Sequence, residues 1–330
     1  MDIVGQSPPR QKEEGIPSFR KQPLLCLLPS DRTRDAEARS TQSPFTFFAS
    51  VSRAKTKEIC KDTGIICISD NVAMAGVFDG FGNGGEVISN DLGKRLLRLA
   101  QTRTPWLENS LDSKTVLRMA ISFCINSGIF NFCECGSTAT MLLLHADGRF
   151  SCSQLGDSPA YGIGKYVDHV FDPNIVVMPT KEGMVHRALA EVRLSPDEYF
   201  MARNVLLSSH AVTKEYDGHN IRTRNGRLAE GSLLMLASDC LPKNLFFETD
   251  SNGFVRNTGG CRDMDKIVAD GRTMGILPGE ALVSTVQRRI LATVRGEEDA
   301  RWVQGKRVRM CADDDFTLIT LGIVGQENGQ

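Results

Sequence analysis

The stretch that decides the fold is residues 76–86, GVFDGFGNGGE. It begins inside an apolar run, AMAGVF (73–78), whose short length and composition predict a β-strand. The strand ends at Asp79, and the glycines that follow are typical of a loop. Asp79 therefore stands where a strand passes into a loop, so that a rigid sheet can hold its carboxylate while the side chain faces a site.

Two more aspartates stand at strand ends in the same way. Asp239 follows LLMLAS (233–238), and Asp314 lies just before FTLITLGIV (316–324). Aspartate is common in loops after strands, so each of these residues taken alone is equally well explained as a turn residue. Three together predict carboxylates that converge from distant parts of the chain.

Convergent carboxylates at strand ends favour a site for hard divalent cations. Mg²⁺ and Mn²⁺ prefer carboxylate, carbonyl and water oxygens, and two adjacent ions need a carboxylate that bridges them. Gly80 follows Asp79 and lacks a side chain, so its carbonyl could approach such an ion closely.

The remaining pattern predicts an α+β domain with mostly antiparallel sheets covered by helices. Short apolar runs predict strands at 64–69, 73–78, 138–145, 150–155, 233–237 and 317–324. Apolar residues spaced by three or four predict helices at 85–101, 113–126, 181–192 and 282–294, the last entered through Pro278 and Gly279.

Composition limits the classes of function. The formal charge of -1, from 39 basic and 40 acidic side chains, gives no general field for nucleic acid or an anionic membrane. No run reaches the ~20 apolar residues of a membrane-spanning helix, and the first residues lack the apolar core expected of a secretory signal. The ten cysteines are scattered, with one close pair, Cys133 and Cys135, and we expect reduced thiols in a cytoplasmic protein.

The expected organisation is one domain with short tails. Residues 1–45 are rich in Pro, Gln, Arg, Glu and Ser, a composition that predicts a disordered N-terminal tail. Residues 46–324 form the predicted domain, and residues 325–330 a flexible C-terminus. We expect a monomer.

Six segments, taken in order, resemble the motifs of the metal-dependent protein phosphatase family (PPM, protein phosphatase 2C-like), closest in pattern to its bacterial members. They are GVFDGFGNGGE, GSTAT, QLGDSPAYGIG, RLSPDEYFMARNVLLSSHAV, LLMLASDCL and DDDFTLITL. The resemblance runs from about residue 50 to 324. It implies a four-layer αββα sandwich, with two central, mostly antiparallel sheets flanked by helices.

The resemblance also implies a set of site residues. Asp79 is similar to the family's bridging aspartate and Gly80 to its carbonyl ligand, while Asp239 and Asp314 match two further metal-binding aspartates. Asp62, 17 positions before Asp79 in ICKDTG, matches one of an early acidic pair. Upstream, Lys57 falls where the family has an arginine that binds the substrate phosphate, and a lysine supplies charge without the two-pronged hydrogen bond. A solvated basic turn is the alternative for Lys57.

The implied reaction is hydrolysis of phosphoserine or phosphothreonine in proteins. Two ions, Mn²⁺ or Mg²⁺, would share and activate a water molecule and polarise the phosphoryl oxygens. No side chain need attack, so catalysis would consist of positioning and charge neutralisation without a phosphoenzyme. The expected partner is a phosphoprotein.

Four departures from the family pattern keep a second interpretation open. Lys61 replaces one carboxylate of the early acidic pair, and Phe81 stands where many relatives have a histidine. Cys133 stands near the position of an accessory aspartate, and Cys240 replaces a glycine that a tight turn would favour. The alternative is therefore a weak or inactive pseudophosphatase that binds phosphoproteins or regulates a partner. An enzyme for small metabolite phosphates is a third possibility.

Overall fold

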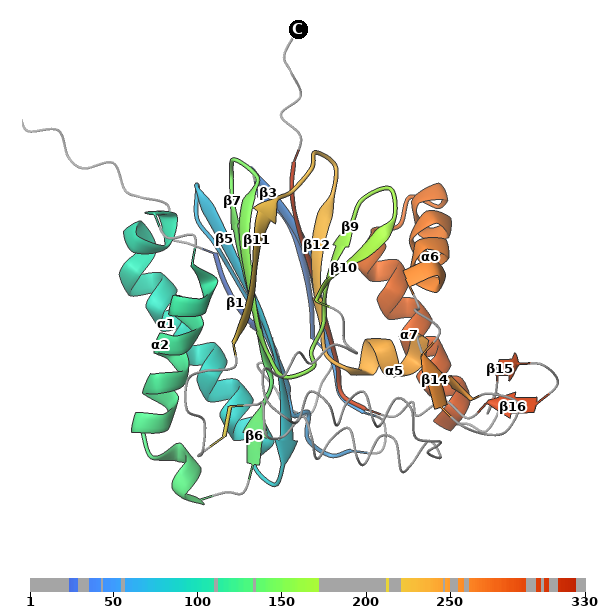
Figure 1. Ribbon diagram of the computed structural model, residues 1–330, viewed down its shortest axis with the longest axis horizontal. Coiled ribbons are helices and arrows are strands. Elements are labelled where there is room, and N and C mark those ends of the chain that lie inside the picture. Colours follow the sequence, from blue (N-terminus) through green and yellow to red (C-terminus); the bar gives the residue numbers. More distant parts are fainter. Residues whose placement is uncertain are drawn as a thin grey trace, which may run out of the picture.

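The computed structural model describes residues 24–28, 36–42, 44–54, 57–109, 112–132, 135–171, 212–213, 221–245, 247–249, 255–257, 261–294, 301–303, 306–308 and 314–324. Within these residues the chain forms four layers, two facing sheets with helices on each outer side (Figure 1). This is the predicted αββα sandwich, and every described strand pair is antiparallel.

The first sheet has the strand order β1-β4-β5-β7-β8-β11, and β6 pairs with the end of β5. The bounds are β1 Leu24–Leu28, β4 Asp62–Ile68, β5 Val72–Gly82, β6 Cys135–Ser137, β7 Ala139–His145, β8 Arg149–Leu155 and β11 Arg222–Arg227. Strand β5, which carries the GVFDGFG stretch, lies between β4 and β7 and is buried along most of its length.

The second sheet has the order β10-β9-β12-β17-β3-β2. Its bounds are β2 Ala36–Gln42, β3 Phe45–Ser52, β9 Ala160–Ile163, β10 Val167–Phe171, β12 Leu233–Ala237 and β17 Phe316–Ile323. Two small hairpins are separate from both sheets, β13 Phe247–Thr249 with β14 Val255–Asn257, and β15 Arg301–Val303 with β16 Lys306–Val308.

Helices cover the outer face of each sheet (Figure 1). The first sheet carries α1 Gly85–Asn109 and α2 Ser113–Asn126, followed by a 3-10 turn, Ile129–Phe132. The second sheet carries α5 Cys240–Leu245, α6 Cys261–Thr273 and α7 Pro278–Val294. The apolar stripes predicted for two helices are confirmed by burial of Ile88, Leu92, Leu96 and Leu99 in α1 and of Leu282, Val286 and Ile290 in α7.

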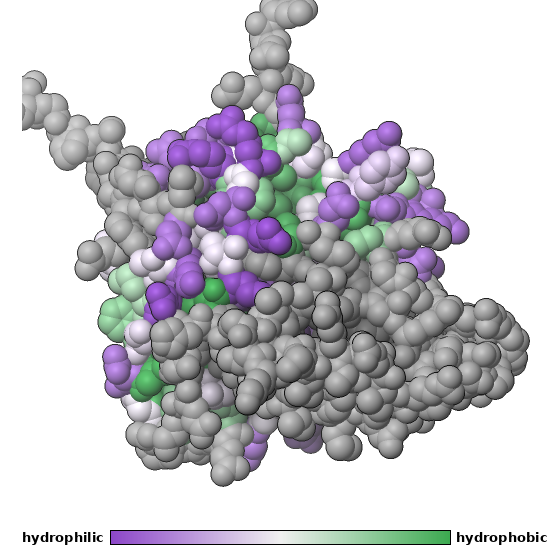
Figure 2. Space-filling view, viewed as in Figure 1, coloured by the Kyte–Doolittle hydropathy of each residue, from purple (hydrophilic) through white to green (hydrophobic). Residues whose placement is uncertain are grey.

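Three separate apolar cores hold the layers together. One lies between the first sheet and its helices, one between the two sheets, and one between the second sheet and its helices. Figure 2 shows apolar residues between the two sheets, with hydrophilic residues on either side. Burial of apolar area at about 25 cal/mol per Å² is the main force that joins these layers.

Parts of the chain differ from the sequence-based expectations. Two strands, β1 and β2, lie within the predicted tail and pair with β4 and β3, so that their backbone groups extend the two sheets. Cys135 is disulfide-bonded, against the expectation of reduced thiols throughout. The predicted helix at 181–192 and the predicted C-terminal tail lie outside the described residues. No helix in the described part of the chain is long and apolar enough to cross a membrane.

Candidate functional site

Asp62 and Asp79 lie opposite each other on adjacent strands of the first sheet. Asp62 begins β4 and pairs in register with Asp79 of β5. Asp62 is 1% exposed, and its Oδ2 accepts a hydrogen bond from Thr317 Oγ1 at 3.0 Å. Its Oδ1 is buried without a hydrogen-bond partner among the described residues. A buried carboxylate oxygen in this state is costly unless a cation neutralises it.

Burial and neighbouring charge both act on Asp62. Loss of solvent raises its pKa well above the ordinary value, and the negative charges of Asp315 and Asp314 raise it further. Hydrogen bonds from Thr317 and Ser238 oppose this rise without cancelling it. Burial and the neighbouring carboxylates therefore favour the protonated, uncharged form of Asp62 unless a cation compensates its charge.

Gly80 occupies a position that only glycine can fill. A Cβ atom there would lie 2.4 Å from the Gly85 carbonyl oxygen and 2.6 Å from that of Lys61. The Gly80 N–H also donates to the Lys61 carbonyl at 3.2 Å. Strand β5 is thus pressed between the start of α1 and the residue before β4, which fixes the backbone beside Asp79.

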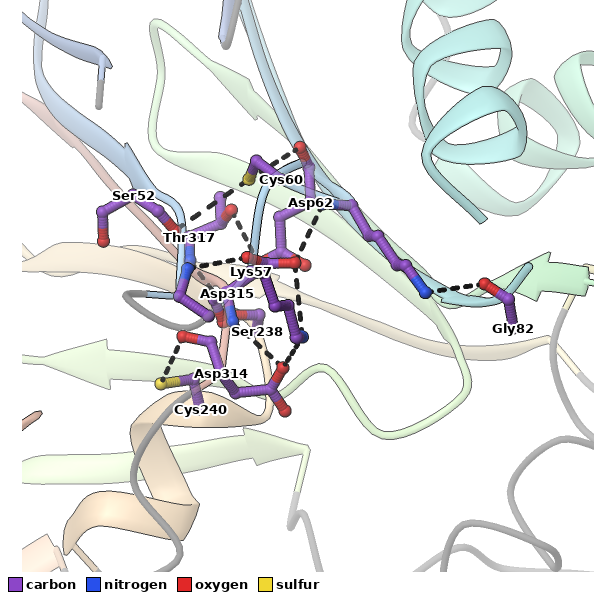
Figure 3. Close-up of polar contacts among 12 residues, drawn as sticks. Ser52, Lys57, Cys60, Asp62, Gly82, Ser238, Cys240, Asp314, Asp315 and Thr317 are labelled. Carbon is purple, nitrogen blue, oxygen red and sulfur yellow. Dashed lines mark hydrogen bonds and ion pairs between the residues drawn. The ribbon is translucent and has the colours of Figure 1, made fainter. Parts of the chain in front are cut away.

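Asp239 and Asp314 come from adjacent strands of the second sheet. The Ser238 N–H donates to the Thr317 carbonyl at 2.9 Å, and the Thr317 N–H donates to Ser238 Oγ at 3.0 Å. These bonds hold the end of β12 against the start of β17. Asp239 is buried, whereas the Asp314 side chain is 31% exposed. Because Thr317 also bonds Asp62, the Asp62 carboxylate of the first sheet lies near Asp314 and Asp315 of the second (Figure 3).

Lys57 brings a positive charge into this group. Its Nζ lies 2.5 Å from Asp314 Oδ1 and 3.5 Å from Asp315 Oδ2 (Figure 3). Burial alone would lower the pKa of Lys57, but the charges of Asp314 and Asp315 and the hydrogen bond to Asp314 outweigh it and raise the pKa above the ordinary lysine value. The side chain is 35% exposed, so a charged ammonium faces both the carboxylates and solvent.

Lys61 contributes a second ammonium at the other side. Its Nζ donates to the Gly82 carbonyl at 2.7 Å, two residues beyond Gly80. Its carbonyl accepts from Ser89 Oγ at 2.6 Å as well as from Gly80. The lysine that replaces the early carboxylate therefore lies along the end of β5.

Asp315 is a member of the site that the sequence analysis did not single out. Its Oδ1 accepts from the Ala54 N–H at 2.8 Å and its Oδ2 from the Lys61 N–H at 2.9 Å. The run of three aspartates at 313–315 was a signal for it, but only the topology shows which of them points inward.

A network of hydroxyl groups is hydrogen-bonded to the backbone of Asp79. The Asp79 N–H donates to Thr138 Oγ1 at 3.2 Å, and the Thr138 N–H donates to the Asp79 carbonyl at 2.9 Å. Thr138 Oγ1 and Ser158 Oγ lie 2.6 Å apart, and Gln154 Nε2 donates to the Ser158 carbonyl at 2.7 Å. The GSTAT and GDS segments thus serve to hold Asp79 in place.

Two of the substituted positions prove to be packing residues. The Phe81 ring lies over Gly136, where an added Cβ would come within 2.4 Å of Phe81 Cζ. Cys240 is fully buried at the first position of α5, and its Sγ contacts the Asp314 carbonyl at 3.7 Å. Cys240 thus begins a helix, whose backbone accepts any L residue. Cys133 lies outside the described residues.

The donors fit a hard divalent cation in their chemistry. They are carboxylate and carbonyl oxygens, with an unsatisfied oxygen on buried Asp62 and a backbone beside Asp79 that excludes a side chain. Among the described residues, however, no three Asp, Glu, His or Cys side chains are grouped so that they could hold an ion. An ion at Asp314 would have to share that carboxylate with Lys57.

Comparisons with known proteins find similar structures but no similar sequence. No protein-family model and no curated protein sequence matches the chain. The catalytic domain of the serine/threonine protein phosphatase PstP, solved with two manganese ions, matches with a TM-score of 0.55 at 16% identity, over 85% of this chain and 98% of that one. The PPM phosphatase MsPP from Mycobacterium smegmatis matches with a TM-score of 0.52 at 16% identity, over 84% and 97%.

A third match is the PP2C phosphatase domain of SpoIIE from Bacillus subtilis, with a TM-score of 0.51 at 14% identity, over 94% of this chain and 81% of that one. At such identities the likeness concerns the fold. The sandwich that the motif resemblance implied is confirmed.

Proposed function

We propose that this chain, which has the fold of PPM-type serine/threonine phosphatases, is a metal-dependent phosphatase that hydrolyses phosphoserine and phosphothreonine in proteins. One observation carries the proposal. Buried Asp62, in register with Asp79, bonds Thr317 at the start of β17, close enough to Asp314 and Asp315 to feel their charge, and it has an oxygen without a partner among the described residues. Such a group is expensive to maintain unless it serves a cation.

Asp79, Gly80, Asp239 and Asp314 would hold Mn²⁺ or Mg²⁺, two ions in all, with Asp62 as an outer partner. When bound, such ions lower the pKa of water and neutralise phosphoryl oxygens. The protein's part is to keep Asp79 fixed through Thr138 and to keep the Lys57 ammonium at the open side of the carboxylates. Lys57 would bind the substrate phosphate as a point charge and orient it.

The proposed partner is a phosphoprotein, and the proposed setting is a cytoplasmic monomer. The near-zero formal charge of -1 favours neither nucleic acid nor an anionic membrane as partner.

A second candidate is a non-catalytic phosphoprotein-binding module. The Lys61 ammonium donates to the Gly82 carbonyl, and the Lys57 ammonium donates to Asp314. The two lysines therefore already supply positive charge beside the carboxylates. Two fixed ammonium groups could bind a phosphate without hydrolysing it. The two candidates differ in whether turnover requires metal.

Hydrolysis of an aryl phosphate with Mn²⁺, with Mg²⁺ or with excess chelator separates them. We expect metal-dependent turnover in the wild type that falls at least about 100-fold in Asp79→Asn. Asp147→Asn, an exposed aspartate paired with Arg149 in a turn, is the matched control and should keep full activity. Equal background rates in every sample would favour the binding module, and faster turnover of sugar phosphates than of phosphopeptides would favour a metabolite phosphatase.

A further inference from the structure

Asp315 is linked to both ends of one loop. Its side chain is 2% exposed. It accepts the Ala54 N–H at 2.8 Å and the Lys61 N–H at 2.9 Å, and it lies 3.5 Å from Lys57 Nζ. These partners are between 254 and 261 positions away in the sequence and all belong to residues 54–61. One buried carboxylate therefore fixes the connection between β3 and β4.

The contacts of Asp315 extend through Lys61 to the backbone beside Asp79. The Lys61 peptide that donates to Asp315 is followed by a carbonyl that accepts from the Gly80 N–H at 3.2 Å and from Ser89 Oγ at 2.6 Å. Because Gly80 N–H and Ser89 Oγ also bind the Lys61 carbonyl, Lys61 keeps these anchors when Asp315 is replaced, whereas the Lys57 ammonium loses one of its two carboxylates.

Lys57 lies in the middle of the same loop. Its N–H donates to the Ala54 carbonyl at 3.2 Å, and its ammonium lies within reach of both Asp314 and Asp315. A free lysine has many side-chain rotamers, and restricting them before a ligand arrives lowers the entropic cost of binding. The backbone hydrogen bond to Ala54 and the two carboxylates together restrict Lys57 in this way.

We propose that Asp315 is a positioning residue that acts through Lys57, holding its ammonium at the open side of the site where a phosphate group would bind. This inference rests on the proposed function for the identity of the ligand. It does not require Asp315 to touch substrate or metal.

A double-mutant cycle tests the coupling. The variants are Asp315→Asn, Lys57→Met and the pair together, with Asp147→Asn as a matched aspartate-to-asparagine control. We expect Asp315→Asn to raise the KM for a phosphopeptide and the Kd for inorganic phosphate about tenfold, while kcat changes less than about threefold. In the Lys57→Met background, Asp315→Asn should change KM and Kd less than about twofold, because the lysine through which Asp315 acts is gone. Additive effects would overturn the proposal.

A second readout does not depend on activity. The rate of reductive methylation of each lysine, measured by peptide mass spectrometry, reports how tightly its amine is held. We expect Lys57 to react several times faster in Asp315→Asn than in the wild type, while exposed Lys165 is unchanged. Unchanged Lys57 reactivity would overturn the positioning role, even with normal turnover. Faster Lys57 methylation in Asp315→Asn, in a protein that shows neither turnover nor phosphate binding, would instead remove the proposed function alone.

Asp315→Glu is the conservative variant, and it tests the proposal even if Asp315→Asn fails to fold. It keeps the negative charge near Lys57 but lengthens the side chain. We expect Lys57 methylation close to the wild-type rate in Asp315→Glu, and circular dichroism should show a folded chain. If Asp315→Glu speeds methylation as much as Asp315→Asn does, the carboxylate charge is not what holds Lys57, and the proposal fails.

Discussion

At the scale of single residues, the charge of the site depends on a few side chains that the sequence could only partly identify. The motif order pointed to Asp62, Asp79, Asp239 and Asp314. Asp315 went unnoticed, because three consecutive aspartates look alike until the strand direction of β17 decides which one is buried. The roles of Lys57 and of the metal-binding residues stay predictions.

Lys61 gives a prediction at this scale. Its ammonium lies on the Gly82 carbonyl, beside the backbone of Gly80. Lys61→Glu replaces a repelling charge with an attracting one, so we expect tighter Mn²⁺ binding by about tenfold, or about 1.4 kcal/mol. Isothermal titration calorimetry measures the change. Lys61→Gln, which removes the charge only, should give an intermediate affinity, and no gain in either variant would contradict this account of Lys61.

Cys240 gives a second prediction. It is fully buried, begins α5 and accepts a contact from Asn244 Nδ2 at 3.3 Å. Cys240→Gly removes buried volume and adds backbone freedom in a helix, so we expect a loss of about 2 kcal/mol in the free energy of unfolding. Urea denaturation checks this. Cys240→Ala should lose less, and an unchanged midpoint for Cys240→Gly would show that the thiol packs poorly.

At the scale of elements, apolar periodicity predicted best where one face is buried. Helices α1, α2 and α7 and strands β5, β8 and β12 lie where the pattern placed them, to within a few residues at most ends. Strand β11, RTRNGR, has no apolar pattern, and backbone pairing with β8 makes it a strand. Helix α6 was missed because its buried stripe is narrow, with Met264 and Val268 as its buried apolar residues in the core.

The contact between β5 and α1 gives a prediction for Gly80. An added methyl group would overlap the carbonyl oxygens of Gly85 and Lys61 at 2.4 and 2.6 Å. Because both obstacles are backbone atoms, we expect Gly80→Ala to destabilise the fold by about 1–3 kcal/mol, measured by urea denaturation. Gly162→Ala, in β9 with nothing within 4 Å of the added atom, is the matched control. Equal midpoints for both variants would contradict the tight contact.

At the scale of the whole molecule, three apolar cores lie between four layers. This packing explains why residues from distant segments of the chain lie close together. The strand patterns predicted the layers, but pairing order is a property of the complete sheets, so the meeting of Asp62 with Thr317 was not readable from either segment. The strands β1 and β2 were assigned to a tail for the same reason, since their stability comes from the sheets they extend.

The buried thiols give a prediction at this scale. Burial raises the pKa of Cys67 to about 12 and also raises the pKa values of Cys60, Cys124 and Cys152. We therefore expect these four cysteines to resist iodoacetamide at pH 8 until the fold opens, because the reactive thiolate is scarce and inaccessible. Cys261, partly exposed on α6, should react before these four. Peptide mass spectrometry measures this order, and early labelling of Cys152 would contradict the inter-sheet core.

The most direct test of the metal centre is a calorimetric titration of Mn²⁺ into the full chain. The account predicts saturable binding in the wild type and in Asp147→Asn, and its loss in Asp79→Asn and Asp239→Asn, with each variant folded by circular dichroism. Absence of Mn²⁺ binding in the wild type, or equal binding in all four proteins, would contradict it.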